Sequence, residues 1–191
     1  MLATVESKSV KDRESAIRTI DTEIDAISKL KNSVALENLT SALDLMQNST
    51  GRIIITGMGK SGHIGKKIAA SLASTGTPSF FVHPAEASHG DLGMITENDV
   101  VVAISNSGES KELVDIINYC KRFGIKIIAI TKNPESSLGK AADIILELPN
   151  YGEACPLGLA PTSSTTTTLV LGDILTAGVI ERKGFSKEEF T

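Results

Sequence analysis

From residue 52 onward, short apolar runs alternate with segments of helical periodicity, and this alternation limits the possible folds more than any other feature. The run at residues 100–104, Val-Val-Val-Ala-Ile, is apolar on both faces and rich in β-branched side chains. Such runs are typical of strands buried in a parallel sheet. Parallel strands need helical crossovers, which cover the sheet on both faces. We therefore expect an α/β fold, a three-layer αβα sandwich with a five-stranded parallel sheet.

The spacing of apolar residues sets the expected boundaries. The predicted strands span residues 53–56, 79–82, 100–104, 126–130 and 144–148. The predicted helices between them span residues 60–73, 109–123 and 136–141, and an almost uniformly apolar stretch at 169–180 predicts a buried closing helix. No linker rich in Pro, Gly or Ser marks a second domain, so we interpret residues 1–191 as a single domain whose core is formed by 51–191.

Residues 1–50 have the pattern of two amphipathic helices. In the first helix, apolar residues recur at intervals of three and four at Ile17, Ile20, Ile24, Ile27 and Leu30. A second stripe of the same kind lies between residues 36 and 46, after a break near residues 32–33. The narrow stripe on the leading helix packs either on its own domain or on another subunit, and the sequence leaves both alternatives open.

The composition narrows the function class. A net charge of −4 with 4% aromatic residues disfavours a nucleic-acid surface, which needs clustered basic residues or stacking rings. The two cysteines, Cys120 and Cys155, form neither a CxxC pair nor a disulfide framework, which favours a reducing compartment. The chain contains no run of eighteen apolar residues, and its first thirty residues lack a signal-peptide core. We expect a cytoplasmic protein that acts on small molecules, with no nucleic-acid or membrane partner.

A turn rich in hydroxyl groups follows the predicted strand at residues 100–104. Ser105, Ser107 and Ser110, with Asn106 and Gly108, stand where the next helix is expected to begin. Free N–H groups and the positive end of the helix dipole point into such a turn and favour an anion. Serine is also a common helix cap, but three hydroxyl groups exceed what capping requires. The turn is therefore interpreted as a phosphate site.

The segment at residues 57–62, Gly-Met-Gly-Lys-Ser-Gly, is a second anion-binding candidate. It fits the dinucleotide fingerprint, but the acidic residue expected at the end of the second strand is missing there, and Glu86 comes too late. A triphosphate loop would need glycine where Ile54 stands. We therefore expect a turn that binds an anion through Lys60 and Ser61, or one that only packs the helix on the sheet.

Three carboxylates are candidates for acid–base chemistry. Glu109 and Glu112 are expected in the first turn of the helix at 109–123, sharing one face, where the dipole alone also explains a negative charge. Glu153 begins a long connection, residues 153–165, that leads into the closing helix. Ordered loops of this length are often functional. A carboxylate there, flanked by apolar residues, is a candidate general base, and the alternative is a solvated surface glutamate.

Two of the three histidines, His83 and His89, flank a short segment after the second strand, on the side of the sheet where ligands bind. A histidine there can act on a sugar hydroxyl group, or it can be an ordinary surface residue. A structural metal site would require four ligands, and only scattered candidates are present. We therefore expect no required metal.

Taken together, four segments resemble the sugar isomerase (SIS) domain, a flavodoxin-like fold, and within it the D-arabinose 5-phosphate isomerases. They read GMGKSG from Gly57, HPAEASHGDLG from His83, ISNSGESKE from Ile104 and EACPLGLAPTSST from Glu153. The resemblance extends from about Gly51 to Phe190. It implies an aldose–ketose isomerase that interconverts D-ribulose 5-phosphate and D-arabinose 5-phosphate through a cis-enediol, for synthesis of the octulosonate sugar of lipopolysaccharide or capsule. It also implies that no redox cofactor is required.

The resemblance assigns roles to matching positions of the chain. It implies catalytic roles for Lys60, His89, Glu112 and Glu153. It implies that the sugar phosphate is bound by Gly59, Ser61, Ser105, Asn106, Ser107, Ser110, Thr162, Ser163, Ser164 and Thr165. We expect Glu153 to shuttle the proton, Lys60 to stabilise the enediolate oxygen, His89 to position a hydroxyl group, and Glu112 to orient His89 or Lys60. It further implies that His83 binds an inhibitory zinc ion and that the protein is a homotetramer.

The chain departs from the family pattern in two ways. Relatives continue into a Ser-His-Pro-Gly-Gly segment whose histidine joins the active site, and they usually add a pair of cystathionine-β-synthase-type modules, whereas this sequence stops at Thr191. The sequence is therefore either an excised domain or a short natural form, and weak activity is expected if that histidine assists the reaction. Two alternatives stay open: a non-catalytic module that senses sugar phosphates, and an isomerase of another pentose or hexose phosphate.

Overall fold

A computed structural model describes the backbone of residues 2–190 and the side chains of residues 8–33 and 35–190. Its centre is a sheet of five parallel strands: β1 (Ile53–Gly57), β2 (Ser79–Val82), β3 (Val100–Ile104), β4 (Lys126–Thr131) and β5 (Ile144–Glu147). The strand order is β2-β1-β3-β4-β5. The predicted strands are thus confirmed, with boundaries that differ by at most one residue.

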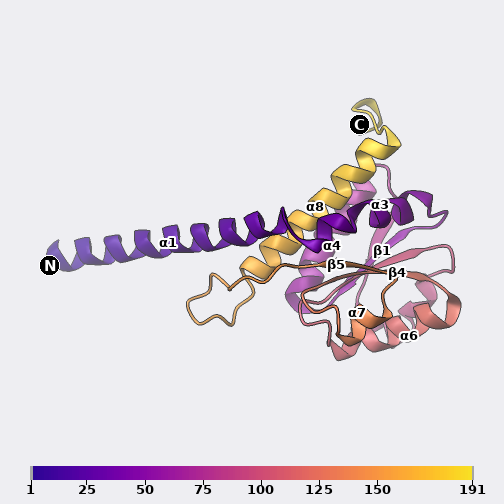
Figure 1. The fold of residues 1–191 in the computed structure, drawn as a ribbon, viewed down its shortest axis with the longest axis horizontal. Helices are drawn as coiled ribbons and strands as arrows, with labels where there is room; N and C mark the ends of the chain where they lie inside the picture. The colour runs from indigo at the N-terminus through magenta and orange to yellow at the C-terminus, as the bar shows by residue number, and fades with distance from the viewer. Residues whose placement is uncertain (1, 191) are drawn as a thin grey trace.

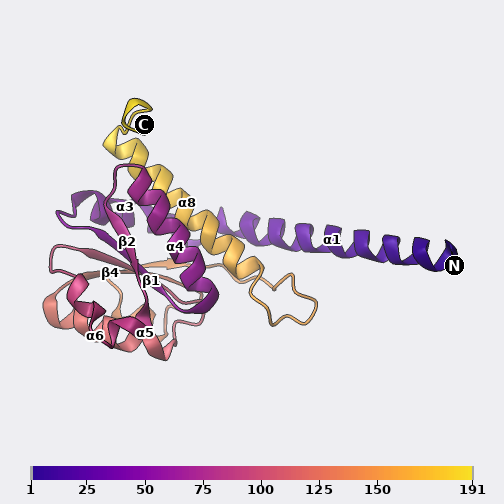
Figure 2. The same ribbon diagram turned by 180° about the vertical axis from the view of Figure 1, so that it is seen from behind.

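The strands are apolar on both faces because helices cover both sides of the sheet (Figures 1 and 2). Alternate residues along a strand point to opposite faces. Accordingly, Ile53 and Ile55 of β1 belong to one hydrophobic cluster, and Ile54 belongs to another. The expected three-layer sandwich is confirmed.

The first cluster is covered by α3 (Leu39–Asn48), α4 (Gly59–Ser74) and α8 (Ser163–Lys183), and the second by α5 (Pro84–Ala87), α6 (Val114–Phe123) and α7 (Ser137–Ala141). Both layers are visible in Figure 1, with α8 and α3 above the sheet and α6 and α7 below it. Within the first of these layers α8 packs closely on α4, and a Cβ at Gly172 of α8 would clash with the side chain of Ile68.

The N-terminal segment forms a long helix, α1 (Leu2–Leu30), whose first part extends away from the sheet (Figures 1 and 2). Its last turns pack on α8, where Ala26 and Leu30 are buried. Ile17, Ile20 and Ile24 are about half exposed, at 48%, 56% and 55%. The apolar stripe therefore divides into a part that packs on its own domain and a part that is uncovered in the single chain.

The second N-terminal helix is interrupted, which the periodicity did not predict. A short helix, α2 (Val34–Glu37), precedes α3, and Asn38 separates them. The side-chain amide of Asn38 donates a hydrogen bond to the backbone carbonyl of Ile145 in β5 at 2.8 Å. This bond ties the N-terminal segment to the edge of the sheet.

Two predicted helix starts were wrong. The helix expected at 109–123 starts at Val114, after the 3-10 turn η2 (Lys111–Leu113), so Glu109 lies outside it and shares no helical face with Glu112. The closing helix starts at Ser163 rather than at residue 169. Its early start is compatible with burial because Thr167 and Thr168 donate their hydroxyl groups to carbonyls four residues earlier.

Candidate functional site

The two anion-binding candidates meet where the strand order reverses. β1 lies between β2 and β3, so the connections after β1 and β3 leave the sheet side by side, and Gly57 pairs with Ile104 in the register. Ligands of open α/β sheets bind at such a switch point, outside the carboxyl ends of the strands. Gly59, Lys60 and Ser61 form the first turn of α4 there. Close packing explains one glycine of this segment, because a Cβ at Gly62 would lie 2.5 Å from the carbonyl oxygen of Gly57.

The turn after β3 is shaped by its own serines. The hydroxyl groups of Ser105 and Ser110 lie 2.9 Å apart, and Ser105 Oγ accepts the N–H of Gly108 at 3.1 Å. Ser107 Oγ accepts the N–H of Glu109 at 3.2 Å. Ser105 is buried, whereas Asn106 and Ser107 are exposed. The hydroxyl groups of Ser105 and Ser110 therefore stabilise the turn itself, whereas Asn106 and Ser107 are the polar residues that a ligand can reach.

Glu109 links the turn after β3 to the start of α7 by hydrogen bonds. Its carboxylate accepts the N–H of Ser137 at 2.8 Å and the hydroxyl group of Ser137 at 2.7 Å, at the start of α7. Both hydrogen bonds lower the pKa of Glu109, and the bond from the Ser137 side chain has the larger effect. Glu112 lies in η2 and is exposed, and no hydrogen bond or ion pair joins it to another residue within the described range.

Glu153 is held against the N-terminus of α8. Its Oε2 accepts hydrogen bonds from the N–H of Thr162 at 2.7 Å, the hydroxyl group of Thr162 at 3.0 Å and the N–H of Ser164 at 3.2 Å. Burial raises the pKa of Glu153, but interactions with Ser164 and Thr162 outweigh burial and bring the pKa below its ordinary value. The positive end of the α8 dipole favours the same charge state. Glu153 is therefore a half-buried, ionised carboxylate at neutral pH.

A cavity of about 540 Å³ lies beside Glu153. It is lined by Asn106, Lys132, Tyr151, Gly152, Glu153, Gly158, Leu159, Pro161 and Ser164. These residues come from the ends of β3, β4 and β5 and from the start of α8. The cavity thus joins the phosphate turn, through Asn106, to the candidate base.

Lys132 and Tyr151 are the cavity residues that sequence reasoning missed. Lys132 follows β4 directly, and its Nζ lies 3.4 Å from the carbonyl oxygen of Tyr151 and 5.3 Å from the centroid of the Tyr151 ring. No carboxylate of the described chain forms a salt bridge with this ammonium group, so it is available to an anionic ligand. Position alone could have indicated it, because polar residues at the carboxyl ends of parallel strands line ligand sites.

The remaining predicted site residues lie on other connections. Lys60 is exposed at the start of α4, and His89 is exposed between α5 and the 3-10 turn η1 (Asp91–Met94), so neither lines the 540 Å³ cavity. Thr165 donates its hydroxyl group to the carbonyl of Thr162 at 2.8 Å. The hydroxyl oxygen of Ser163 is buried without a partner. The structure therefore unites Asn106, Glu153 and Ser164 and leaves Lys60, His89 and Glu112 outside their cavity.

His83 was expected to bind an inhibitory zinc ion. Its Nδ1 is buried and has no hydrogen-bond partner, and its ring lies edge-on to Phe81 with centroids 6.2 Å apart. Among the residues that the structure describes, no group of three or more His, Cys, Asp or Glu side chains is arranged to hold a metal ion. Zinc binding by His83 remains a prediction.

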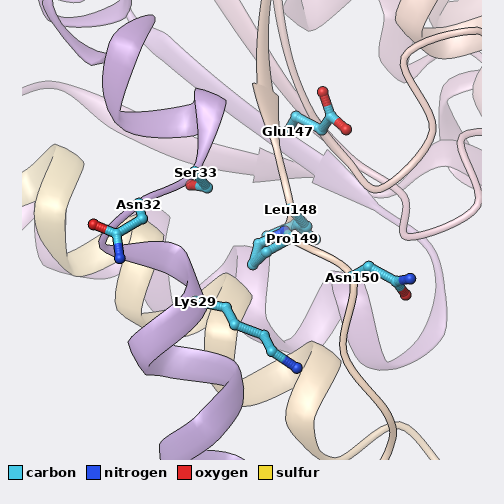
Figure 3. A pocket seen from close by; sticks show the side chains of 7 residues that line it. All are labelled: Lys29, Asn32, Ser33, Glu147, Leu148, Pro149 and Asn150. Atoms are coloured by element: carbon cyan, nitrogen blue, oxygen red, sulfur yellow. The ribbon is translucent and has the colours of Figure 1, made fainter.

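A second cavity, of about 390 Å³, lies between the end of α1 and the segment after β5 (Figure 3). Its lining includes Lys29, Asn32, Glu147 and Asn150. The ammonium group of Lys29 forms a salt bridge with Asp25 at 2.7 Å. None of the predicted site residues lines this cavity, so the cavity at Glu153 is the better candidate. Within residues 2–190, no helix is both long and apolar enough to span a membrane.

Comparisons with known proteins place these features in a family. The SIS domain profile matches residues 45–177. Arabinose 5-phosphate isomerase KdsD of Pseudomonas aeruginosa is 57% identical over 176 residues, which cover 92% of this chain and 54% of the relative. KdsD of Francisella tularensis is 54% identical over 178 residues, with the same coverage. The chain thus spans about half the length of the curated relatives it matches.

A solved structure extends the likeness to the whole described fold. An E. coli CFT073 protein in complex with arabinose 5-phosphate superposes with a TM-score of 0.91 at 39% sequence identity, covering 95% of this chain and 96% of that one. Together with the match over residues 45–177, this likeness shows that the chain belongs to the SIS domain family.

Proposed function

We propose that the chain is an aldose–ketose isomerase that interconverts D-ribulose 5-phosphate and D-arabinose 5-phosphate. The observation that carries the proposal is the ionised Glu153 carboxylate on a cavity that also contains Asn106 of the phosphate turn and the ammonium group of Lys132, which has no carboxylate partner in the described chain. The relatives named arabinose 5-phosphate isomerase and the structure solved with arabinose 5-phosphate support the choice of substrate.

In the proposed reaction, Glu153 removes a proton from C1 of the ketose, beside the C2 carbonyl, and a cis-enediol forms as O2 takes up a proton. The proton then returns to C2 while O1 loses its proton and C1 becomes the aldehyde carbon. Three residues that lie outside the 540 Å³ cavity in the single chain complete the proposal: Lys60 stabilises the developing enediolate oxygen, His89 positions a hydroxyl group, and Glu112 orients His89 or Lys60. No redox cofactor takes part, because the reaction only moves hydrogen within the substrate.

The phosphate is assigned to the turn after β3 and the first turn of α4, where Ser61 and Ser107 add hydroxyl groups to free backbone N–H groups. Gly59 and the Ser105–Ser110 pair shape these turns, and Ser163, Ser164 and Thr165 complete the site at α8. The product fits a reaction sequence that leads to the octulosonate sugar of lipopolysaccharide or capsule.

The assembly and surroundings are also part of the proposal. We propose that residues 1–191 form one SIS domain and that it associates as a homotetramer in the cytoplasm. The half-exposed Ile17, Ile20 and Ile24 support self-association, since an apolar stripe on a projecting helix is more stable when covered. His83 is also proposed to bind an inhibitory zinc ion, for which its Nδ1, buried without a hydrogen-bond partner, is a candidate ligand atom.

The competing function is a module that binds a sugar phosphate without converting it. A sensor requires the phosphate turn but no base, and the ionised carboxylate at the cavity favours the isomerase. An isomerase of a different pentose or hexose phosphate is the other alternative, which a substrate panel distinguishes by relative kcat/KM.

Replacement of the proposed base tests the function. Glu153→Gln keeps the shape of the side chain but removes the basic oxygen, so exchange of the C1 or C2 hydrogen with deuterated water should fall by at least about 1,000-fold. Glu147→Gln is the matched control, because Glu147 lies at the end of β5 and lines the other cavity. Exchange at the wild-type rate in Glu153→Gln would eliminate Glu153 as the base.

A further inference from the structure

Thr162 forms hydrogen bonds with residues at the beginning of the loop that carries Glu153. Its hydroxyl oxygen accepts the N–H of Ala154 at 2.8 Å and the N–H of Cys155 at 3.3 Å, and its hydroxyl proton points to Glu153 Oε2 at 3.0 Å. The backbone N–H of Thr162 donates to the same carboxylate oxygen at 2.7 Å. One residue therefore ties the two ends of the 153–162 segment together around the carboxylate.

The number of lone pairs fixes the direction of these bonds. A threonine hydroxyl group has one proton and two lone pairs. The N–H groups of Ala154 and Cys155 occupy the lone pairs, so the proton is directed at Glu153. A protonated Oε2 would find no acceptor there, and the arrangement accordingly favours the ionised carboxylate.

The same arrangement separates the roles of the two carboxylate oxygens. Oε2 accepts the hydrogen bonds from the Thr162 N–H, the Thr162 hydroxyl group and the Ser164 N–H, and none of these three goes to Oε1. The side chain of Ser164 is a further group that lowers the pKa of Glu153. Oε1 is therefore the oxygen available to take a proton from a molecule in the cavity. The hydroxyl group of Thr162 is fully used within the protein and has neither a proton nor a lone pair left for the sugar phosphate.

We propose that Thr162 is a positioning residue that fixes Glu153 Oε2 and leaves Oε1 as the proton acceptor, and that it is not a substrate ligand. This inference rests on the proposed isomerase function. It also explains why the loop returns to Glu153 at the start of α8: the residue that precedes the helix provides both its N–H and its hydroxyl group to the carboxylate.

Other titratable groups near Glu153 are distinguishable from it in a pH profile. Burial, and then the charge of Glu153, raise the pKa of Tyr151. The N–H groups of Ala160 and Leu159 lower the pKa of Cys155, whose ordinary value is 9.0. Lys132 is the cation that lines the cavity. Since a carboxyl group titrates well below a tyrosine or a cysteine, the acidic limb of a profile contains Glu153 and the phosphate of the substrate, and a titration without substrate assigns the shift to Glu153.

The test compares Thr162→Val and Thr162→Ser with the wild type. Valine removes the hydroxyl group at nearly constant volume, whereas serine retains it. The control is Thr176→Val, because the Thr176 hydroxyl group donates to the Gly172 carbonyl at 2.9 Å further along α8. Thermal unfolding measured by circular dichroism identifies variants that fold, and kcat, KM and the pH dependence of kcat/KM are measured for each.

In Thr162→Val we expect kcat to fall about 10-fold to 100-fold, KM to change less than about 3-fold, and the acidic limb to move upward by about 1 on the pH scale, because a hydrogen bond to the charged form is lost. Thr162→Ser should restore both kcat and the limb. A raised KM with an unchanged kcat and an unchanged limb would show that Thr162 binds substrate and would overturn the proposal.

A second readout is independent of turnover. Carbon-13 NMR of the glutamate carboxyl groups, with Glu153 assigned from the Glu153→Gln spectrum, gives the pKa of Glu153 without substrate. The proposal predicts a higher value in Thr162→Val than in the wild type and Thr162→Ser. An unchanged value contradicts the proposed role of Thr162, whereas a raised value in a protein that converts no substrate contradicts only the isomerase function.

Discussion

The hydroxyl groups of Ser105 and Ser110 lie 2.9 Å apart and close the turn that follows β3. Because Ser105 Oγ also accepts the N–H of Gly108, this residue shapes the turn from its buried side. Ser107 lies in the same turn but is exposed. Loss of the Ser105 hydroxyl group should therefore affect both stability and ligand binding, whereas loss of the Ser107 hydroxyl group should affect binding alone.

Ser105→Ala should lower the free energy of unfolding by about 1 kcal/mol, since a buried hydroxyl group and its hydrogen bonds are lost. Ser107→Ala should leave stability unchanged within about 0.5 kcal/mol. Both substitutions should weaken binding of arabinose 5-phosphate, as measured by calorimetric titration. Full affinity in Ser107→Ala would remove the exposed hydroxyl group from the phosphate site.

Gly108→Ala tests how tightly the turn packs on α7. Gly108 has a φ of +71°, and a Cβ there would clash with the hydroxyl group of Ser136. We expect a loss of about 3 kcal/mol in urea unfolding, from backbone strain and the clash together. Gly124→Ala is the matched control, because Gly124 has a φ of +69° and open space around its Cβ position. It should lose only about 1 kcal/mol, and equal losses would contradict the packing argument.

Lys132→Met should raise the Kd for arabinose 5-phosphate about 10-fold, because the cavity loses a cation that has no carboxylate partner in the described chain. The salt dependence of binding should become weaker in this variant. Lys140→Met is the control, since Lys140 is exposed and forms a surface salt bridge with Glu135 at 3.6 Å. If Lys132→Met binds as tightly as the control, the cation does not contact the ligand.

The ionised carboxylate of Asp99 is expected to stabilise the fold, and this contribution should decrease at acidic pH. Burial raises its pKa, but hydrogen bonds from Thr96 and Arg52 lower the pKa below 3.8 overall. A group whose pKa is lower in the folded state stabilises the protein above its unfolded pKa, and this stability is lost as the pH falls through the folded value. Asp99→Asn should therefore lose about 2 kcal/mol at pH 7 and less at pH 3.

Urea unfolding at both pH values measures this difference. Asp25→Asn is a suitable control, because Asp25 forms only an exposed salt bridge with Lys29, and such pairs contribute little. The same loss for Asp99→Asn at pH 7 and at pH 3 would show that the charge of Asp99 does not stabilise the fold.

The strands were predictable because each is a short, mostly apolar run. A run such as Val100–Ile104, which is apolar at every position, is typical of a strand buried on both faces of a parallel sheet. The start of α6 was not predictable, because it depends on tertiary contacts: Glu109 bonds to Ser137, which is distant in sequence. The early start of α8 was missed for a different, local reason: the polar threonine run does not show the apolar pattern of a buried helix, yet Thr167 and Thr168 donate their hydroxyl groups to carbonyls within the helix.

Two candidates named from the sequence line the 540 Å³ cavity, and each belongs to a pattern within one segment: Asn106 to the serine turn, and Glu153 to the loop before the hydroxyl cluster. Lys132 was missed because a single lysine belongs to no recognisable motif, although its position directly after β4 was a usable signal. The hydrogen bonds of Thr162 to Ala154 and Glu153 could not be predicted from the sequence, because they depend on the path of the loop.

The most direct test of the proposed function is the conversion of D-ribulose 5-phosphate by this chain in deuterated water, followed by proton and carbon NMR. The isomerase function predicts the appearance of arabinose 5-phosphate carrying deuterium at C2, and its loss in Glu153→Gln. Binding of ribulose 5-phosphate without conversion or exchange would contradict the isomerase and support a sugar-phosphate sensor.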